Sequence, residues 1–190
     1  MLSKIKEDVI NMNSDLADLR RKSNVFPVIG EGSHNAEIIF IGEAPGRNEA
    51  ESGKPFCGRA GQILDELLNS INLSRKDVYI TNIVKDRPPN NRDPLPSEIE
   101  EYGPFLDRQI EIIKPKIIAT LGRFSAQYIL SKYGVTNILP ITKINGKVFE
   151  VNGLKIITLL HPASTIYDSS KKKGLVDGFK ILNYNLKHDN

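Results

Sequence analysis

With 190 residues, of which 39% are hydrophobic, the chain is long enough for one domain with a sizeable core, and no apolar run reaches the ~18 residues of a membrane span. The first residues lack the apolar segment and cleavage site of a secretory signal peptide, so we expect a cytoplasmic protein with no membrane partner. Cys57 is the only cysteine, which excludes an internal disulfide and an all-cysteine metal or iron–sulfur site, while a net charge of +3 permits a polyanion partner without requiring one.

Residues 1–24 carry an apolar stripe at helical spacing. Hydrophobic side chains recur at alternating intervals of three and four residues, at Leu2, Ile5, Val9, Met12, Leu16 and Leu19. Positions at this spacing share one face of a helix. We therefore expect an N-terminal helix over residues 1–24 whose apolar face packs on the rest of the domain.

Strand and helix patterns alternate along the rest of the chain. The apolar runs that predict strands are Ile38–Ile41, Val78–Thr81, Lys116–Leu121 and Leu154–Leu160, and the helical patterns cover residues 60–71, 97–114, 123–132 and 174–187. This alternation predicts a single three-layer α/β/α domain over residues 1–190, with a central, mostly parallel, four-stranded sheet.

Local signals refine these boundaries. Ser97 and Glu100 have the spacing of a capping box at the start of the helix over residues 97–114. Asn152-Gly153 is a favoured hairpin turn before the last strand. The proline-rich stretch Arg87–Pro96 is expected to lack regular structure.

The predicted strands end in residues that suit ligand binding. The first strand leads into Gly42-Glu43-Ala44-Pro45-Gly46, the second into Asn82, the third into Gly122 and the fourth into His161. In an open α/β sheet, ligands bind in the crevice beyond the carboxyl ends of the strands. A carboxylate, an amide and an imidazole that lie far apart in the sequence would therefore converge there, which predicts an active site.

The turn Gly42–Gly46 follows a buried strand. Its glycines let the backbone approach a ligand closely, and its exposed amides suit an oxyanion or a phosphate. It is not a P-loop, because Pro55 stands where the serine or threonine that binds magnesium would be. An ordinary strand-to-loop turn accounts equally well for the glycines, but Glu43 and Glu49 in the same loop favour a chemical role.

Three other side chains have both a chemical and a structural interpretation. Asn82 offers a donor and an acceptor that can pair with the edge of a base, although asparagine at a strand end is often a turn former. His161 is a candidate electrophile or general acid–base, although a lone histidine is usually a hydrogen-bonded structural residue. Phe56 is either a core residue or a platform on which a base stacks.

The segment after His161 contains groups that suit phosphate contacts, namely Ser164, Thr165, Lys171, Lys172 and Lys173. Most basic runs of this kind are solvated surface. Because this run lies just downstream of the His161 loop, its position favours contact with a polyanion.

A series of short motifs follows in order from about Gly30 to the C-terminus: Gly42-Glu43-Ala44-Pro45-Gly46, Gly53-Lys54-Pro55-Phe56, Gly58-Arg59-Ala60-Gly61-Gln62, Tyr79-Ile80-Thr81-Asn82, Arg87-Pro88-Pro89, Asn91-Arg92-Asp93-Pro94, Leu121-Gly122-Arg123 and His161-Pro162-Ala163. Together they resemble the uracil-DNA glycosylase superfamily, specifically its thermostable-type family 4 branch. The resemblance implies a monomeric enzyme that hydrolyses the N-glycosidic bond of deoxyuridine in single- or double-stranded DNA and initiates base-excision repair. The target base would be flipped out of the DNA helix into the pocket.

The resemblance also implies roles for individual residues of the base site. Phe56 would stack on uracil, Asn82 would recognise its polar edge, and Gly42 would complete the site. His161 would hydrogen-bond uracil O2 as negative charge develops on the departing base.

Two further segments receive roles from the same resemblance. Glu43 and Glu49 would lie in the loop that places the attacking water, and the choice between them stays open. Ser164 and the segment Thr165–Lys173 would pinch the DNA backbone, with Ile166 or Tyr167 as the wedge that fills the vacated stack.

The chain departs from family 4 at the four cysteines that bind an iron–sulfur cluster in that family. Judged by the flanking motifs, these positions hold Asp15, Asp18, Asp86 and either Tyr102 or Gly103. We therefore expect no cluster and no other cofactor, with the N-terminal helix and the proline-rich loop held by packing. The aspartates also admit a hard-cation site, but solvated surface is favoured, so no metal is predicted.

Ala50 is a second departure, because the family usually has aspartate there. It keeps open one alternative, a module that binds damaged DNA without cleaving it. Two further alternatives are a glycosylase for hypoxanthine or xanthine and a metal-dependent hydrolase that uses the aspartates. Asn82 favours uracil, because an amide can match the edge of that base. The presence of Glu43 and His161 beside it favours an enzyme.

Overall fold

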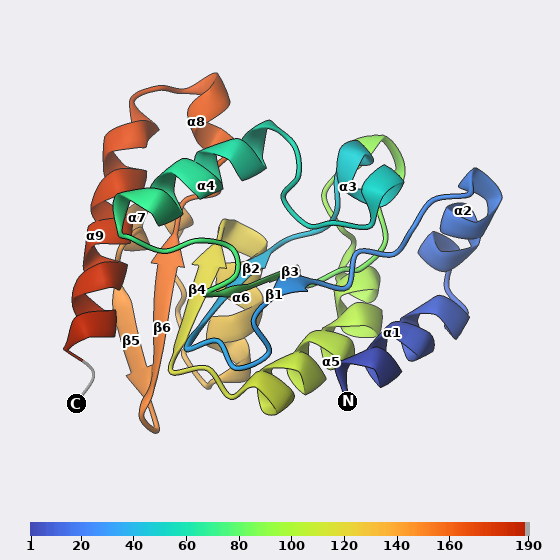
Figure 1. Ribbon diagram of the computed structural model, residues 1–190, viewed down its shortest axis with the longest axis horizontal. Coiled ribbons are helices and arrows are strands. Elements are labelled where there is room, and N and C mark those ends of the chain that lie inside the picture. The colour runs from blue at the N-terminus through green and yellow to red at the C-terminus, as the bar shows by residue number, and fades with distance from the viewer. Residues whose placement is uncertain (189–190) are drawn as a thin grey trace.

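The computed structural model describes residues 1–188, so the last two residues of the predicted domain lie outside the described part. A six-stranded sheet in the order β1-β3-β2-β4-β6-β5 runs through the molecule (Figure 1). The strands are β1 (Glu31–Gly32), β2 (Ile38–Gly42), β3 (Tyr79–Asn82), β4 (Ile117–Leu121), β5 (Val148–Val151) and β6 (Leu154–Leu159). The central strands β3, β2, β4 and β6 are parallel, whereas β1 and β5 pair antiparallel at the two edges.

The α/β class and the parallel centre are confirmed, but the predicted number of strands is wrong because each edge carries one more strand. β5 joins β6 through the predicted hairpin turn, in which Asn152 and Gly153 have the positive φ values of 52° and 80° that a type I′ turn requires. β1 is only two residues long, too short to leave a strand pattern in the sequence. It approaches β3 so closely that a Cβ on Gly32 would lie 2.0 Å from the carbonyl oxygen of Val78.

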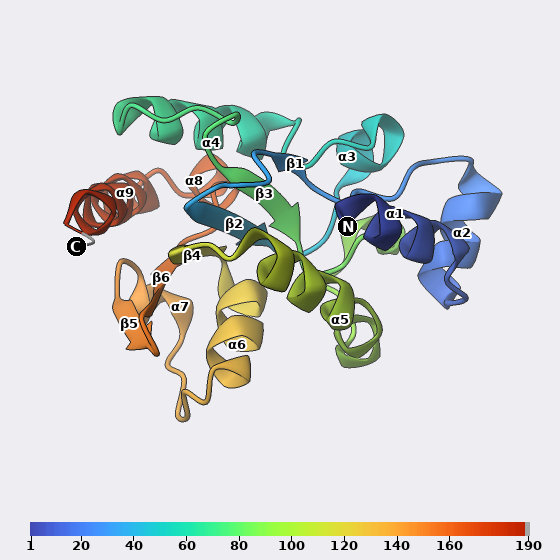
Figure 2. The same cartoon turned by 60° about the horizontal axis from the view of Figure 1, so that its bottom comes forward.

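Helices cover both faces of the sheet, which gives the predicted three layers (Figure 2). Leu64 and Phe179 belong to the core on one face, and Ile110 and Ile129 to the core on the other. Strands covered on both sides are buried throughout, which explains their nearly continuous apolar sequence. The helices are α1 (Leu2–Asn11), α2 (Asp15–Ser23), α3 (Arg47–Ser52), α4 (Arg59–Ser70), the 3-10 helix η1 (Pro89–Asn91), α5 (Pro96–Ile113), α6 (Arg123–Lys132), α7 (Ile141–Ile144), α8 (Ser164–Tyr167) and α9 (Lys171–Lys187).

The N-terminal segment forms two helices, so the prediction of one helix over residues 1–24 is wrong. α1 ends at Asn11, and Ser14 begins α2 by accepting a hydrogen bond from the backbone N of Ala17 at 3.2 Å. A serine N-cap with extended backbone interrupts the helix although the apolar stripe continues through it. The stripe still faces the protein, because Ile5 and Leu16 are fully buried in one hydrophobic cluster.

Several other boundaries differ from the predicted ones. α5 begins at Pro96 rather than with a Ser97–Glu100 capping box, because the carboxylate of Glu98 accepts the backbone N–H of Leu95 at 2.7 Å. The proline-rich stretch contains the single turn η1, and α9 begins at Lys171, before the predicted Gly174. No helix within residues 1–188 is long and apolar enough to cross a membrane.

Candidate active site

A cleft of about 560 Å³ opens beyond the carboxyl ends of the parallel strands. Its walls include five of the side chains singled out in the sequence: Glu43, Glu49, Phe56, Asn82 and His161. They come from the segment between β2 and α4, which includes α3, from the end of β3 and from the loop after β6. The parallel topology thus brings together residues that lie far apart in the sequence, as the strand pattern predicts.

Gly42 lies at the floor of this arrangement, where β2 and β3 end side by side. The register of the two strands places Gly42 opposite Asn82. A Cβ on Gly42 would lie 2.2 Å from Oδ1 of Asn82 and 2.7 Å from the ring of Phe56. Only glycine therefore allows the amide and the aromatic ring to occupy the same end of the cleft.

Asn82 presents an unusual polar group. The residue is 1% exposed, and its side-chain Nδ2 has no hydrogen-bond partner among the described residues. A side-chain contact with Asn82 lowers the pKa of the Glu49 carboxyl, so the amide lies close to that carboxylate, but the geometry between the two groups does not make a hydrogen bond. Because nearly all buried polar groups in proteins are hydrogen-bonded, an orphaned donor in a cleft is a natural contact point for a ligand acceptor.

Glu49 is engaged by the backbone on both of its carboxylate oxygens. Oε2 accepts the N–H of Gly46 at 2.7 Å, and Oε1 accepts the N–H of Phe56 at 2.5 Å. Burial raises its pKa, and these two N–H groups oppose the rise. Phe56 has a φ of 50°, a left-handed conformation that is uncommon for a residue with a side chain. Glu49 therefore holds the turn that places the Phe56 ring.

Phe56 combines the two interpretations left open by the sequence. It is 4% exposed and belongs to the core cluster on the α4–α9 side of the sheet, yet it also lines the cleft. Its ring lies 5.7 Å from the imidazole of His161, centroid to centroid, with the planes inclined by 28°. The two rings thus form an aromatic wall of the cleft.

His161 is held as a neutral hydrogen-bond donor. Its Nδ1 accepts the backbone N–H of Ala163 at 3.1 Å, so Nδ1 carries a lone pair and the ring proton is on Nε2. Burial lowers the pKa of His161 to about 4, which keeps the imidazole uncharged at neutral pH. The arrangement supplies one N–H donor without adding a charge.

Glu43 differs from Glu49 in that no hydrogen bond within residues 1–188 engages its carboxylate. Burial raises the pKa of Glu43 to about 7, Asp93 adds to the rise, and Arg123 opposes it. A carboxyl group with a pKa near neutrality in a cleft is suited to accept or donate a proton.

The predicted DNA-binding segment reaches the cleft only in part. Ile166 and Tyr167 line the cleft, and the Tyr167 side chain is 89% exposed. Oγ of Ser164 is buried and has no partner among the described residues, whereas the Thr165 hydroxyl donates to the Pro162 carbonyl at 2.9 Å.

The three lysines, Lys171, Lys172 and Lys173, form the first turn of α9 and do not line the cleft. Lys171 is ion-paired with Asp168 at 3.4 Å, while Lys172 and Lys173 are exposed. Their placement beside α8 leaves them near the opening and outside the base site.

Sequence reasoning missed four polar residues that also line the cleft: Arg47, Asn48, Arg59 and Asn91. Arg47 begins α3, where it pairs with Glu51 at 2.8 Å, and Arg59 is the exposed first residue of α4. The sequence signal that could have identified these residues is their position inside or next to the motifs that resemble the family. Without the fold, an exposed arginine in such a loop cannot be distinguished from solvated surface.

The four positions that hold cysteine in family 4 do not form a cluster site in this chain. Asp15 and Asp18 are exposed, whereas Asp86 and Tyr102 are buried and bonded to each other. Iron–sulfur clusters are held by cysteine thiolates, so this set of oxygen donors does not fit one. No group of three or more metal-ligating side chains occurs in the part of the chain that the structure describes.

Comparison with known proteins adds independent information. A family model described as the uracil DNA glycosylase superfamily matches residues 29–180. The chain is 49% identical over 187 residues to a type-4 uracil-DNA glycosylase of Sulfurisphaera tokodaii, covering 95% of this chain and 83% of the relative. It is 44% identical over 183 residues to a type-4 uracil-DNA glycosylase of Archaeoglobus fulgidus, covering 93% of this chain and 90% of the relative. The family match spans every residue that lines the cleft.

Proposed function

The chain belongs to the uracil-DNA glycosylase superfamily, and from this premise we propose that its cleft removes uracil from DNA by hydrolysing the N-glycosidic bond. The observation that carries the proposal is the Asn82 side chain, which lines the same cleft as Phe56 and the neutral His161 and whose buried Nδ2 has no hydrogen-bond partner among the described residues. A base buried in duplex DNA cannot reach such a site, so the nucleotide is flipped out of the stack.

Asn82 supplies the selectivity for uracil. Uracil presents the acceptor O4 and the donor N3–H, which match the Nδ2 donor and the Oδ1 acceptor of one amide. Cytosine presents a donor in place of O4 and an acceptor in place of N3–H, so neither hydrogen bond would form. A buried amide left unpaired in this way penalises the wrong base strongly.

His161 acts on the leaving group. When the bond between C1′ and N1 breaks, its electron pair stays with uracil and negative charge develops on O2. The Nε2–H of His161 donates to that oxygen, and a positioned donor of this kind is typically worth about 2.7–4 kcal/mol. Phe56 supports the stacked base while the charge develops.

Glu43 is the group that activates the water. Both oxygens of Glu49 are occupied by backbone N–H groups, so Glu49 positions the turn, whereas the Glu43 carboxylate is available. The water oxygen forms the new bond to C1′, and its proton passes to Glu43. Uracil leaves as its N1 anion and takes up a proton from the solvent, and Glu43 returns the proton of the attacking water to the solvent, so that the products are free uracil and an abasic site.

The DNA contacts surround the cleft. Tyr167, or Ile166 beside it, fills the space left by the flipped base, while Ser164, Thr165, Lys171, Lys172 and Lys173 contact the backbone. Arg47 and Arg59 are further phosphate contacts, because both line the cleft and both are exposed. The enzyme acts as a cytoplasmic monomer without cofactor or metal, on single- or double-stranded DNA.

Three alternatives can be separated from this proposal by one assay, run in EDTA and repeated with Mg²⁺. Labelled single- and double-stranded oligonucleotides carrying one uracil, hypoxanthine, xanthine or cytosine are incubated with the protein in EDTA and then treated with alkali. We expect strand breaks only at uracil. Breaks at hypoxanthine or xanthine instead would identify a different glycosylase, and tight binding without breaks would identify a lesion-binding module. Breaks that require a divalent metal would contradict the metal-free mechanism.

A further inference from the structure

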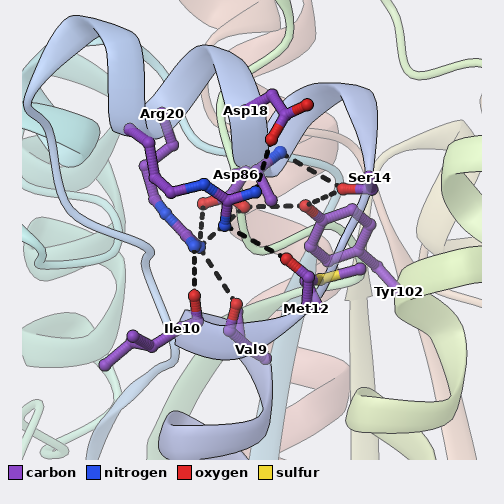
Figure 3. A network of polar contacts seen from close by, with 10 residues as sticks. Val9, Ile10, Met12, Ser14, Asp18, Arg20, Asp86 and Tyr102 are labelled. Carbon is purple, nitrogen blue, oxygen red and sulfur yellow. Dashed lines mark hydrogen bonds and ion pairs between the residues drawn. The ribbon is translucent and has the colours of Figure 1, made fainter.

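A buried polar network joins the N-terminal helices to the end of β3 (Figure 3). We call Arg20, Asp86, Tyr102 and Ser14 the Arg20 network. Nη1 of Arg20 donates to both carboxylate oxygens of Asp86, at 3.1 and 2.9 Å, and the Tyr102 hydroxyl donates to Oδ2 of Asp86 at 2.7 Å. Because the Tyr102 hydrogen is used in this way, the hydroxyl of Ser14 donates to Tyr102 across 3.1 Å.

The network connects four parts of the chain at one carboxylate. Arg20 also caps the end of α1, where Nη1 and Nη2 donate to the carbonyls of Val9 and Ile10 at 3.1 and 2.8 Å. Asp86 follows β3, and Tyr102 belongs to α5. Arg20, Asp86 and Tyr102 are 6%, 1% and 0% exposed. Buried charges are tolerated only when they are paired and hydrogen-bonded, and here the guanidinium and the hydroxyl satisfy the carboxylate.

The same place would hold the iron–sulfur cluster if the chain carried the family cysteines. By the resemblance, Asp86 and either Tyr102 or Gly103 occupy two of those positions, and α2 carries the two others, Asp15 and Asp18. Asp18 pairs with Arg21 at the surface, at 2.5 Å, and takes no part in the network. The expectation that packing alone replaces the cluster is therefore incomplete, because an ion pair and a chain of hydrogen bonds connect the same elements.

Lys85, the residue before Asp86, makes a second set of buried polar contacts that includes the backbone of Asn82. Lys85 is fully buried, and its Nζ donates to the Asn82 carbonyl at 2.6 Å, to Oε1 of Gln109 at 2.7 Å and to the Thr81 hydroxyl at 2.9 Å. Lys85 and Asp86 are consecutive, so the five residues from Asn82 to Asp86 are fixed at both ends by buried polar contacts. A shift of Asp86 would be transmitted to the Asn82 backbone over this short distance.

We propose that Arg20 and Asp86 are positioning residues for Asn82: the Arg20 network joins α1 and α2 to the end of β3 in place of an iron–sulfur cluster and so sets the base-recognising amide. This inference rests on the proposed function of Asn82. It gives Arg20 and Asp86 a role in uracil excision although neither side chain contacts the substrate, and this role does not require a bound metal.

The test compares Arg20→Gln with Arg21→Gln in the full-length protein. Both changes remove an arginine charge from adjacent positions of α2, but within residues 1–188 the Arg21 side chain bonds to Asp18 and to the Met12 carbonyl and makes no hydrogen bond to Asp86. Amide hydrogen exchange of residues 2–23 and 82–86 is measured together with kcat for uracil excision and the Kd for DNA, at a temperature at which each variant is folded. For Arg20→Gln we expect exchange at least tenfold faster in both segments and a kcat at least tenfold lower, with unchanged Kd for DNA. Arg21→Gln should leave all three quantities unchanged.

A repair variant keeps the test informative if Arg20→Gln fails to fold. The double change Arg20→Gln with Asp86→Asn removes both charges while leaving donors and acceptors in place, and we expect it to recover most of the protection and of kcat. Tyr102→Phe removes one hydrogen bond and should shift the same quantities less. Unchanged exchange in Arg20→Gln, or faster exchange with unchanged kcat, would overturn the positioning role. If the unaltered protein did not excise uracil, the proposed function would be overturned instead. The hydrogen exchange of residues 82–86 would still decide whether the network holds that segment.

Discussion

The hydrogen bond from the Ala163 backbone to Nδ1 determines how His161 can act, because it leaves Nε2–H as the only donor of the ring. His161→Ala should lower the single-turnover rate of uracil excision by about 10²–10³, the usual effect of removing one preorganised donor. DNA affinity should be retained, because the imidazole is uncharged and its contribution belongs to the transition state. His34→Ala, outside the cleft, is the matched control. An unchanged rate in His161→Ala would remove this residue from the mechanism.

Asn82 is expected to set the choice of base. Asn82→Asp replaces the Nδ2 donor by an oxygen, which repels uracil O4 and accepts the amino group of cytosine. We therefore expect weaker excision of uracil and the appearance of cytosine excision. Rates measured on matched oligonucleotides that differ only in the target base give the ratio directly. Intact uracil excision by this variant would contradict the assigned recognition.

Glu43 should give the reaction its dependence on pH. The pKa of Glu43 is raised to about 7 by burial, so the carboxyl is protonated below that pH and unable to accept the proton of water. The rate should fall about tenfold for each pH unit below 7. His161, with a pKa lowered to about 4, stays neutral over this range and adds no second limb near neutrality.

The variant pair Glu43→Gln and Glu49→Gln separates the two glutamates. Glu43→Gln should be slow at every pH and lose the acidic limb, which is the fall in rate below pH 7. Glu49→Gln should be slower because Phe56 is less well held, yet it should keep the limb, since Glu43 is intact. A limb that vanished in Glu49→Gln and survived in Glu43→Gln would reverse the two assignments.

At the scale of elements, the sequence pattern predicted those parts of the fold that depend on local signals. The strands β2, β4 and β6 are mostly apolar, and Asn152-Gly153 specifies its own turn. β1 could not be predicted, because its two residues pair only where Gly32 permits close approach to β3. The break between α1 and α2 does have a local signal, the Ser14 N-cap, which the apolar stripe obscured.

Some features of the candidate site could likewise be predicted from the sequence, and others could not. The motifs identify Glu43, Asn82 and His161, and the parallel sheet explains why they meet. Two features could not be predicted: both oxygens of Glu49 accept backbone N–H groups, and Arg59 lines the cleft. Both depend on how the loops fold over the strand ends, and the periodicity of the sequence contains no signal for that.

The first turn of α9 is expected to contribute to DNA binding through charge rather than through the base site. Replacing Lys171, Lys172 and Lys173 by alanine should reduce the salt dependence of DNA affinity, by up to about 0.9 in the logarithmic slope for each phosphate that is no longer neutralised. Lys180→Ala on the same helix is the control, because Lys180 already pairs with Asp177 at 3.1 Å. A slope that does not change in the triple variant would place the backbone contacts elsewhere, with Arg47 and Arg59 as the next candidates.

At the scale of the whole molecule, the sheet connects the base site, which is built from the family motifs, to the N-terminal helices, which the Arg20 network holds in place of a cluster. The cleft is assembled from the segments that follow the carboxyl ends of the central strands. The helices α1 and α2 lie at one side of the molecule (Figure 1) and are attached through the Arg20 network. An apolar cluster that contains Val9 and Tyr102 reinforces this attachment. The protein is therefore expected to keep its fold and its activity when iron is withheld during expression.

The central claim is that this cleft releases uracil from DNA, and the most direct measurement is the amount of free uracil produced. A duplex with one uracil is incubated with excess protein in EDTA, and the liberated base is quantified by mass spectrometry. The account predicts one uracil released for each duplex, with an abasic site left in the strand. An intact duplex that stays bound to the protein, with no free uracil, would contradict it.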